Sequence, residues 1–360
     1  MLNNIYFKAP FTYFGGKAMI ASVVWKCLGQ PDHYIEPCFG SGAVLLARPG
    51  WFPEMTETVN DKDGFVANVW RSIQFSPAET AKVCDWPVNH ADLIARKARL
   101  IREENYLLEN LCKDDKWHDV ELAGYWIWAA SCWIGSGLTC PGQRPHLGDN
   151  KGAGVHAVGK RPHLSNKGIG VHAIGRIPHL ADKGKGVHAI GQIPHLSTKG
   201  AGIHASADDG GIYDWFAALS HRLRYVRVVC GDWSRVCGGN WQSDNNHWKN
   251  VGIFFDPPYA SEDRNLDLYH HDGTNVSREI GAWCLERGAR PEYRIVIAGY
   301  ENEYPALLDA SWQTYQWKTR GGYGNIARSG VTRGQTNRHR EMLYVSPYCE
   351  NEVQGILPFE

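Results

Sequence analysis

The 360-residue sequence lacks a surplus of either charge, since 38 basic side chains balance 38 acidic ones. Any affinity for a polyanion must therefore come from local clustering of basic residues. The ten cysteines include no Cys-x-x-Cys pair, which disfavours a metal or disulfide framework and is typical of a reduced cytoplasm. Met1 to Lys17 lacks the apolar core of a signal peptide, and the longest apolar run, around Tyr125 to Leu138, is too short to span a bilayer. We expect a cytoplasmic protein of about two domains without a metal or membrane partner.

One apolar stretch ends in residues that are suited to chemistry. Gly252 to Phe255 runs directly into Asp256-Pro257-Pro258-Tyr259, and the two prolines forbid further backbone pairing. We therefore expect a buried strand that leaves a carboxylate and an aromatic ring at the carboxyl edge of a sheet, where open α/β sheets bind ligands. A strand that ends in an ordinary Asp-Pro turn is the alternative.

These residues suit transfer of a group to the exocyclic amine of adenine. That amine is a poor nucleophile because its lone pair is conjugated with the ring. Acceptors on both N–H groups, here the Asp256 carboxylate and the Pro257 carbonyl, would favour the pyramidal geometry that frees the lone pair. Proline fixes the backbone dihedral that aims such a carbonyl. Tyr259 would then stack on a base that has been rotated out of the duplex.

Two glycine-containing segments occur near the start of the chain. Gly15 and Gly16 precede Lys17 and a helical pattern over Ala18 to Leu28. Paired glycines let backbone amides approach a ligand, and the lysine can meet a carboxylate, although a turn that starts a helix is the simpler interpretation of this segment alone.

The second segment has the order strand, glycine turn and helix. His33 to Glu36 predicts a strand, Gly40 and Gly42 predict the turn, and Ala43 starts an apolar helix. This order suits a nucleotide-type ligand at the first crossover of a doubly wound sheet, but two glycines are fewer than a nicotinamide site requires. Thr58 to Asp61 then predicts a second strand that ends in an acid, which would either hold a ribose hydroxyl or cap a helix.

In order and spacing, these motifs resemble the Dam-like family of DNA adenine methyltransferases. The matching segments are Tyr13-Phe14-Gly15-Gly16-Lys17, Glu36-Pro37-Cys38-Phe39-Gly40-Ser41-Gly42, Asn60-Asp61 and Asp256-Pro257-Pro258-Tyr259. The resemblance covers about the first 75 residues and most of the chain from Tyr213 onward. It implies an α/β, Rossmann-like S-adenosylmethionine-dependent methyltransferase fold, a mixed sheet flanked by helices, with an inserted helical and repeat-bearing region for DNA recognition.

The resemblance also implies roles for individual residues. Tyr13 and Lys17 would meet the methionine carboxylate of S-adenosylmethionine, and Asp61 would hold its ribose hydroxyls. The other residues around the cofactor would be Gly15, Gly16, Glu36, Pro37, Gly40, Gly42, Asp232 and Trp233. The last two follow a strand expected over Val226 to Cys230 and would contact the cofactor's adenine, although a Gly-Asp turn is common in any protein. Cys38-Phe39 replaces the more frequent Phe-Val, which is an apolar exchange.

The middle of the chain contains an array of repeats at residues 143–205. A Gly-x-Gly-[Val/Ile]-His-Ala motif recurs every 16 residues, at His156, His172, His188 and His204. Each unit has one lysine in the same place, and these are Lys151, Lys167, Lys183 and Lys199. The array holds nine basic and two acidic side chains, a net charge of +7. We expect it to contact the phosphate backbone of double-stranded DNA, and a solvated glycine-rich insertion is the alternative. The histidines lack compact zinc-ligand spacing.

The remaining patterns give the domain borders. We expect a catalytic domain at residues 1–75 and 210–360, interrupted by a target-recognition region at 76–209. The expected helices are Ala91–Leu111, Ala123–Leu138, Tyr213–Leu223 and Val276–Arg287, and the last expected strands are Arg294–Gly299, Trp312–Trp317 and Met342–Ser346. Arginines such as Arg328, within Arg320 to Arg340, form a second candidate phosphate surface unless they serve solubility alone.

The sequence thus predicts a DNA methyltransferase that transfers a methyl group from S-adenosylmethionine to the adenine amine, in the cytoplasm of a bacterial or phage-infected cell. The family usually has Asn-Arg where Ala129-Ala130 stand, so no target sequence is carried over. The repetitive array predicts relaxed sequence specificity. Two alternatives stay open. One is methylation of the cytosine exocyclic amine, and the other is a non-catalytic DNA-binding or coating protein built around the array.

Overall fold

The computed structural model describes residues 7–11, 13, 16–50, 56–133, 138–139, 211–238, 250–259, 275–317 and 341–350. The chain divides into two compact units. The described residues of the first, the helical unit, fall within Met1–Tyr13 and Asp63–Arg224. Those of the second, the sheet unit, fall within Phe14–Lys62, Tyr225–Leu266 and His271–Glu360.

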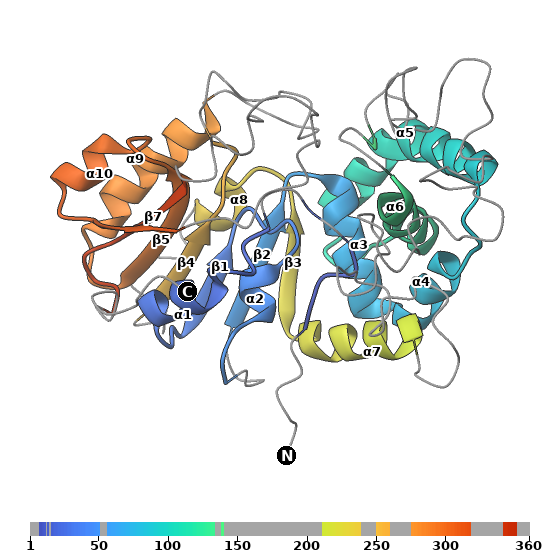
Figure 1. Ribbon diagram of the computed structural model, residues 1–360, viewed down its shortest axis with the longest axis horizontal. Helices are drawn as coiled ribbons and strands as arrows, with labels where there is room; N and C mark the ends of the chain where they lie inside the picture. The colour runs from blue at the N-terminus through green and yellow to red at the C-terminus, as the bar shows by residue number, and fades with distance from the viewer. Residues whose placement is uncertain are drawn as a thin grey trace, which may run out of the picture. The chain divides into compact units, whose positions relative to one another are not determined.

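The described part of the helical unit consists of helices that pack around one apolar helix. They are α3 (Gly64–Phe75), α4 (Pro77–Cys84), α5 (His90–Lys113), α6 (Val120–Cys132) and α7 (Gly211–Leu223) (Figure 1). The apolar helix α6 contacts α3, α4 and α5, and α7 contacts α3 and α4. Because α3 and α7 bury their apolar sides within this group, residues 63–75 and 211–224 belong to it. The sequence analysis had set the borders after residues 75 and 209 and had assigned both segments to the catalytic domain.

Side-chain hydrogen bonds fix the ends of these helices. Asp63 caps α3, because its carboxylate accepts the backbone N–H groups of the first turn at 2.8 and 3.4 Å. The buried Arg71 of α3 donates through Nη1 to the carbonyls of Leu111, Asp114 and Trp117, at 3.1, 2.8 and 3.2 Å. One guanidinium therefore ties α3 to the end of α5 and to the segment that precedes α6.

The sheet unit has one sheet of seven strands in the described ranges. The strands are β1 (His33–Glu36), β2 (Thr56–Asp61), β3 (Val226–Cys230), β4 (Val251–Phe255), β5 (Tyr293–Tyr300), β6 (Gln313–Gln316) and β7 (Glu341–Val345). The helices of this unit are α1 (Ala21–Leu28), α2 (Ala43–Leu46), α8 (Ser234–Cys237), α9 (Val276–Gly288) and α10 (Pro305–Asp309). All strands predicted from the sequence are present, with ends within two residues of the expected ones.

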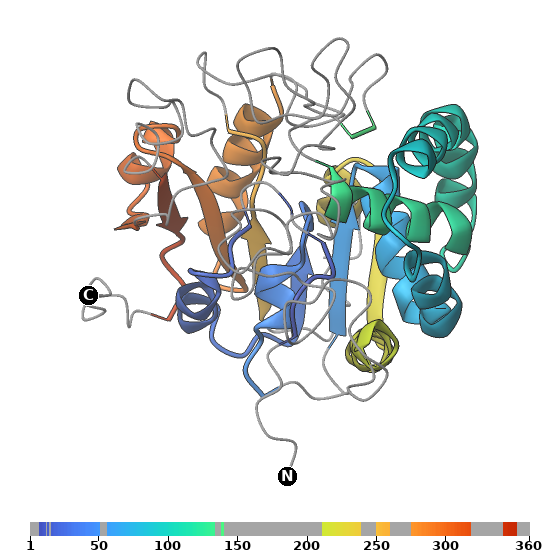
Figure 2. The same ribbon diagram turned by 45° about the vertical axis from the view of Figure 1, so that its right-hand side comes forward.

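The strands are ordered β3-β2-β1-β4-β5-β7-β6. Strands β1 to β5 run parallel, whereas β7 lies antiparallel between β5 and β6. Figures 1 and 2 show the parallel strands side by side. The predicted α/β class with a mixed sheet flanked by helices is confirmed, and the arrangement is compatible with a Rossmann-like fold. The chain leaves β1 toward β2 and leaves β4 toward β5, so the sheet has its switch point between β1 and β4.

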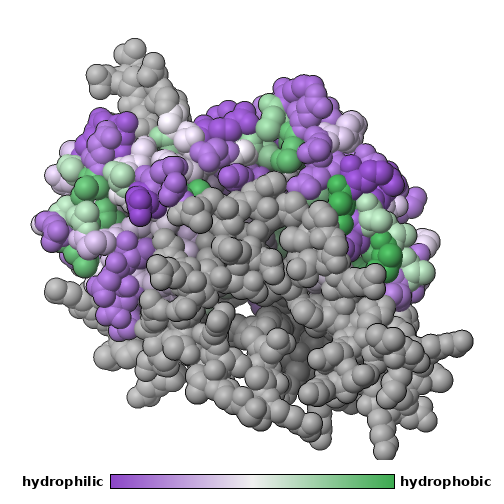
Figure 3. Space-filling view, turned by 90° about the horizontal axis from the view of Figure 1, so that it is seen from above, coloured by the Kyte–Doolittle hydropathy of each residue, from purple (hydrophilic) through white to green (hydrophobic). Residues whose placement is uncertain are grey.

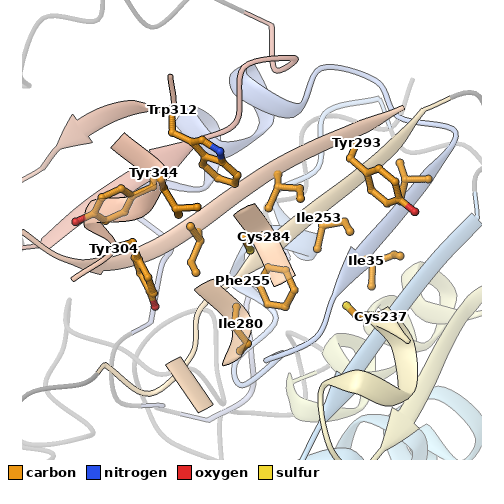
Figure 4. Packing of buried hydrophobic residues seen from close by; sticks show 14 of the residues in the cluster. Ile35, Cys237, Ile253, Phe255, Ile280, Cys284, Tyr293, Tyr304, Trp312 and Tyr344 are labelled. Atoms are coloured by element: carbon orange, nitrogen blue, oxygen red, sulfur yellow. The ribbon is translucent and has the colours of Figure 1, made fainter. Parts of the chain in front are cut away.

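Helices cover both faces of the sheet at β4. Ile253 and Phe255 pack with Ile280 of α9 in an apolar core (Figure 4). Toward the other face, a Cβ added at Gly252 would lie 3.7 Å from Leu28 of α1. Successive side chains of a strand point to opposite faces, so a strand that is covered on both sides needs an unbroken apolar sequence. This explains why the apolar run before Asp256 does not alternate with polar residues.

The face of the molecule seen in Figure 3 is mostly hydrophilic where residues are described, with small separate hydrophobic groups. None of the helices in the described ranges combines the length and the apolar character that crossing a bilayer requires.

Candidate active site

The candidate site lies in the sheet unit, where β1 and β4 end beside each other. Ile35 of β1 is in register with Ile253 of β4, so Glu36 and Asp256 both lie at the carboxyl edge of the sheet. Loops that follow two such strands diverge, because the two crossovers lead to opposite sides. The position expected for a ligand of an open α/β sheet is therefore flanked by two carboxylates.

Asp256 holds an ion pair with Lys17 at this edge. Lys17 Nζ lies 2.9 Å from Asp256 Oδ1, with the two side chains 4% and 23% exposed. The Tyr259 hydroxyl donates to the same oxygen at 3.3 Å, and the ammonium lies 5.3 Å from the centre of the Tyr259 ring. Burial raises the pKa of the Asp256 carboxyl, while the charge and hydrogen bond of Lys17 and the Tyr259 hydroxyl lower it in part. A lysine expected at a cofactor carboxylate is thus paired with the acid after β4.

The segments on either side of this pair have the predicted local structure, a turn that starts a helix after Lys17 and a strand that ends before Asp256. The backbone carbonyl of Lys17 accepts the N–H of Ile20 at 3.1 Å, which is the turn that starts α1. Pro257 is buried, and Pro258 and Tyr259 are half-buried. No hydrogen-bonded strand continues past Phe255 in the described residues, because proline has no N–H to donate.

The glycine turn after β1 folds over the end of β2. Gly40 and Gly42 have φ angles of 48° and 62°, the left-handed region that glycine adopts without strain. The Gly40 N–H donates to Asp61 Oδ2 at 2.7 Å, and the Phe39 N–H donates to the carbonyl of Asn60 at 2.9 Å. Asp61 is therefore not the helix cap that the sequence allowed, since Asp63 fills that role. Its carboxylate instead shapes the loop.

Glu36 and Pro37, at the end of β1, hold the same turn in place through hydrogen bonds. The Glu36 carboxylate is 2% exposed, and its Oε2 accepts the Tyr34 hydroxyl at 2.8 Å and the Leu45 N–H at 3.2 Å. Burial raises the pKa of this carboxyl, and the two hydrogen bonds oppose the rise. Asn60 Nδ2 donates to the carbonyls of Pro37 and Gly231, both at 2.9 Å. Asn60, which lies in β2, therefore links the loops after β1 and β3, a role that the sequence did not reveal.

The end of β3 brings Asp232 and Trp233 to the same edge. The Asp232 side chain is exposed, and its Oδ1 accepts the N–H and hydroxyl of Ser234 at 3.1 and 2.7 Å. The Trp233 ring packs edge-on against Phe255 and Trp283, with centroids 6.0 and 6.1 Å apart. The indole Nε1 of Trp233 is buried, and no described residue accepts its hydrogen. A buried donor of this kind calls for an acceptor that the described residues do not supply.

Cys38 follows β1 and is affected electrostatically by three of these carboxylates. Burial raises the pKa of its thiol, and the negative charges of Asp61, Asp256 and Glu36 raise it further. Acids from the ends of β1, β2 and β4 are thus all close enough to act electrostatically on one half-buried side chain. Together with the Lys17–Asp256 pair, this places residues from three distant segments at one edge of the sheet.

Two residues of this edge escaped the sequence analysis. Tyr300 ends β5, and its ring meets the Tyr259 ring edge-on, with centroids 4.7 Å apart. Glu341 begins β7 and is in register with Tyr300. The predicted strands stopped at Gly299 and began at Met342, one residue short in each case. For the parallel strands, we expected the residues at the carboxyl ends to meet at one edge of the sheet. Knowledge that β7 is antiparallel would have added its first residue to that edge.

Some predicted site residues cannot be placed at this edge. Tyr13 belongs to the helical unit, where its ring lies 6.4 Å from that of Phe11. Gly16 is exposed. The remaining predicted residues lie outside the described residues, and they are Gly15, Lys151, Lys167, Lys183, Lys199 and Arg328. The described residues contain no group of three or more His, Cys, Asp or Glu side chains that could hold a metal ion.

A comparison of the chain with protein-family models and with curated protein sequences finds no match.

Proposed function

We propose that this chain is an S-adenosylmethionine-dependent methyltransferase that acts on the exocyclic amine of adenine in DNA. The observation that carries the proposal is the cluster of Lys17, Asp256 and Tyr259 at the switch point of the sheet. A carboxylate at the end of a buried strand, followed by two prolines and an aromatic ring, supplies what an amine nucleophile needs. The amine needs an acceptor, a fixed carbonyl and a flat surface for the base.

The acceptor geometry supports this chemistry. Lys17 and Tyr259 both donate to Oδ1 of Asp256. These two partners fix the orientation of the carboxylate and therefore the direction of Oδ2. An amine N–H that binds Oδ2, with its second N–H on the Pro257 carbonyl, would be drawn out of conjugation with the ring. The amine becomes cationic as it gains a methyl group and loses its proton afterwards, so no base is needed at the attacking nitrogen. Positioning and electrostatics would supply the rate.

The cofactor would occupy the edge between the glycine turn and the end of β3. S-adenosylmethionine supplies an electrophilic methyl group on a sulfonium ion. A Cβ added at Gly42 would lie 2.6 Å from the Phe39 ring, so this position favours glycine. Without a side chain at Gly42, a ligand could approach the backbone of this turn closely. Glu36, Asp61 and Trp233 lie at or just after the carboxyl ends of β1, β2 and β3, and they include two acids and a buried indole N–H. These features suit a cationic nucleoside ligand that has hydroxyl groups and ring nitrogens.

The partner is proposed from the sequence as double-stranded DNA. The four repeat lysines Lys151, Lys167, Lys183 and Lys199, with Arg328, would contact phosphates. Such contacts bind any sequence, and each one makes affinity more sensitive to salt. Relaxed target specificity follows from the proposal.

The test is incorporation of tritium from labelled S-adenosylmethionine into duplex DNA, followed by digestion to nucleosides. Label in N6-methyl-2′-deoxyadenosine is expected, and Asp256→Asn should reduce it by about 10²–10³-fold, as for other groups that stabilise developing charge. Asp309→Asn is the matched control, because it removes an exposed acid of the same unit. Label in N4-methyl-2′-deoxycytidine would favour the cytosine amine as acceptor. Absence of label together with intact DNA binding would favour a coating protein.

A further inference from the structure

The Tyr259 ring lies among three side chains at the carboxyl edge of the sheet. Its hydroxyl donates to Asp256 Oδ1 at 3.3 Å, and the Lys17 ammonium lies 5.3 Å from the centre of the ring. The third side chain is Tyr300, whose ring meets the Tyr259 ring edge-on, with centroids 4.7 Å apart and an interplanar angle of 65°. The proposed chemistry uses the first two and assigns no role to Tyr300.

The backbone of Tyr300 is held by side chains at both of its polar atoms. Its N–H donates to Glu303 Oε2 at 2.7 Å, and its carbonyl accepts the Tyr344 hydroxyl at 2.7 Å. The same carbonyl accepts the N–H of Glu303 at 3.1 Å, which closes a turn directly after β5. A strand end has fewer ladder partners than a strand centre, and these hydrogen bonds take their place. Tyr300 is therefore fixed on both sides of its Cα atom.

The turn after β5 has backbone features that let Glu303 reach Tyr300. Asn302 has a φ of 64°, a left-handed conformation that residues other than glycine rarely adopt. A Cβ added at Gly299 would lie 3.0 Å from Glu303 Oε2, so the glycine leaves space for the carboxylate. The Ser277 hydroxyl of α9 donates to the other oxygen, Oε1, at 2.5 Å. Backbone strain of this kind is typical of positions where a side chain is held for a function.

The hydrogen bonds that hold Tyr300 run from the core to the site. Tyr344 and Tyr304 are 0% and 5% exposed, and their rings pack edge-on with centroids 5.2 Å apart. Tyr300 itself is half-buried, so the bonds to its backbone do not serve to bury an apolar side chain. They end instead at a ring whose contact is Tyr259.

We propose that Tyr300 is a positioning residue of the Asp256 site. Its fixed ring keeps the Tyr259 ring from rotating away, so that the Tyr259 hydroxyl stays on Asp256 Oδ1 and the ring stays where a base would stack. Tyr300 acts through Tyr259 and does not bind the target base. The contact between the two rings stands on the geometry, whereas its consequence for methyl transfer rests on the proposed function.

The contact is tested by ¹⁹F NMR of the full chain, with 3-fluorotyrosine placed at position 259 alone. Tyr300→Leu removes the neighbouring ring, so the resonance should move and its line shape should show faster ring flips. Tyr300→Phe keeps the ring and should restore the wild-type spectrum. Tyr300→Met provides a second variant without a ring in case leucine disturbs folding. An unchanged spectrum in the variants without a ring would overturn the proposal.

The matched control is Tyr348→Leu. Tyr348 belongs to the same unit and is 45% exposed, so its replacement makes the same chemical change away from the two rings. The spectrum of the label at position 259 should stay as in the wild type. Equal changes in Tyr300→Leu and Tyr348→Leu would mean a general effect of losing a tyrosine and would overturn the proposal.

Kinetics of methyl transfer separate positioning from a structural role. Tyr300→Leu should lower kcat by about tenfold, with KM for S-adenosylmethionine changed less than about twofold, and Tyr300→Phe should restore most of kcat. In a chain that already carries Tyr259→Leu, Tyr300→Leu should lower kcat no further, because Tyr300 acts through Tyr259. A merely structural tyrosine would lower kcat by the same factor in both backgrounds, and that result would overturn the proposal.

The two measurements also distinguish failure of this inference from failure of the proposed function. If the wild-type chain transfers no methyl group, the proposed function fails, and the ¹⁹F spectra still decide whether Tyr300 holds Tyr259. If the chain transfers methyl groups and the losses from Tyr259→Leu and Tyr300→Leu multiply, only this inference fails.

Discussion

The two edges of the sheet each carry an ion pair, and the pairs differ in what surrounds them. At the amino edge, Arg48 Nη1 lies 3.1 Å from Glu57 Oε1, with the side chains 0% and 1% exposed. The same guanidinium donates to the Pro31 carbonyl at 3.2 Å and stacks on Trp25. Protein atoms shield this pair from solvent, as is typical of an ion pair with a structural role.

At the carboxyl edge, the Lys17–Asp256 pair is partly open and is accompanied by surplus acids. Asp256 keeps 23% of its side chain exposed, and its charge raises the pKa values of the Glu36 and Glu341 carboxyl groups. Both pairs have a similar distance, so distance alone does not distinguish them. The balance of charge and the remaining access to solvent do separate them.

The largest expected effect is on the closed pair. Arg48→Met would leave Glu57 buried without its cation, and breaking such a pair costs about 3–5 kcal/mol of unfolding free energy. Lys17→Met should cost clearly less, because Asp256 can reach solvent and take up a proton. Urea unfolding of the two variants at neutral pH measures the difference. Equal losses would mean that the two edges do not differ in the way described.

The pH dependence of stability should also distinguish the edges. His33 begins β1 at the amino edge, where burial and the nearby charges of Arg227 and Arg48 lower its pKa to about 4. A histidine with a depressed pKa stabilises the fold fully above its unfolded value near 6.5, and this contribution is lost as the pH falls toward 4. The loss amounts to about 3 kcal/mol. His33→Gln, which can still meet the Thr58 hydroxyl, should flatten the unfolding free energy between pH 6.5 and 4.

The acids of the carboxyl edge give the opposite slope. Their pKa values are raised in the folded chain, so they contribute stability at low pH that is lost as the pH rises through the folded values. Asp256→Asn should therefore increase the loss of unfolding free energy on acidification, whereas His33→Gln should decrease it. The same slope in both variants would contradict the assignment of opposite charge balance to the two edges.

Much of the carboxyl edge could be predicted from the sequence because its signals are local. An apolar run that stops at Asp256-Pro257 or before a glycine turn marks a strand end, and the ends of parallel strands meet at one edge. The ends of β1, β2, β3 and β4 were all predicted in this way. The same local logic did not predict α3, although Asp63 and the apolar pattern over Phe65, Val69 and Ile73 would have indicated it.

The missing parts depend on contacts between segments that are distant in the sequence. Nothing near Lys17 indicates that its partner is Asp256, and nothing near Glu341 indicates that β7 enters the sheet antiparallel between β5 and β6. The split into units likewise depends on which helices share a core, and α3 and α7 carry no local mark of their unit. Residue roles that rest on sheet order therefore came only with the fold.

The smallest expected effect compares two glycines with the same backbone conformation at opposite edges. Gly42 and Gly50 both have a φ of 62°. Alanine at Gly50, an exposed position before β2, should cost about 1 kcal/mol for the left-handed conformation alone. Alanine at Gly42 adds a contact of 2.6 Å with the Phe39 ring, and such overpacking brings the total to roughly 2–3 kcal/mol. Thermal unfolding measures both losses. Only Gly42→Ala should also weaken the proposed binding of S-adenosylmethionine, because only that turn lies at the carboxyl edge of the sheet. Equal weakening by both variants would place the ligand elsewhere.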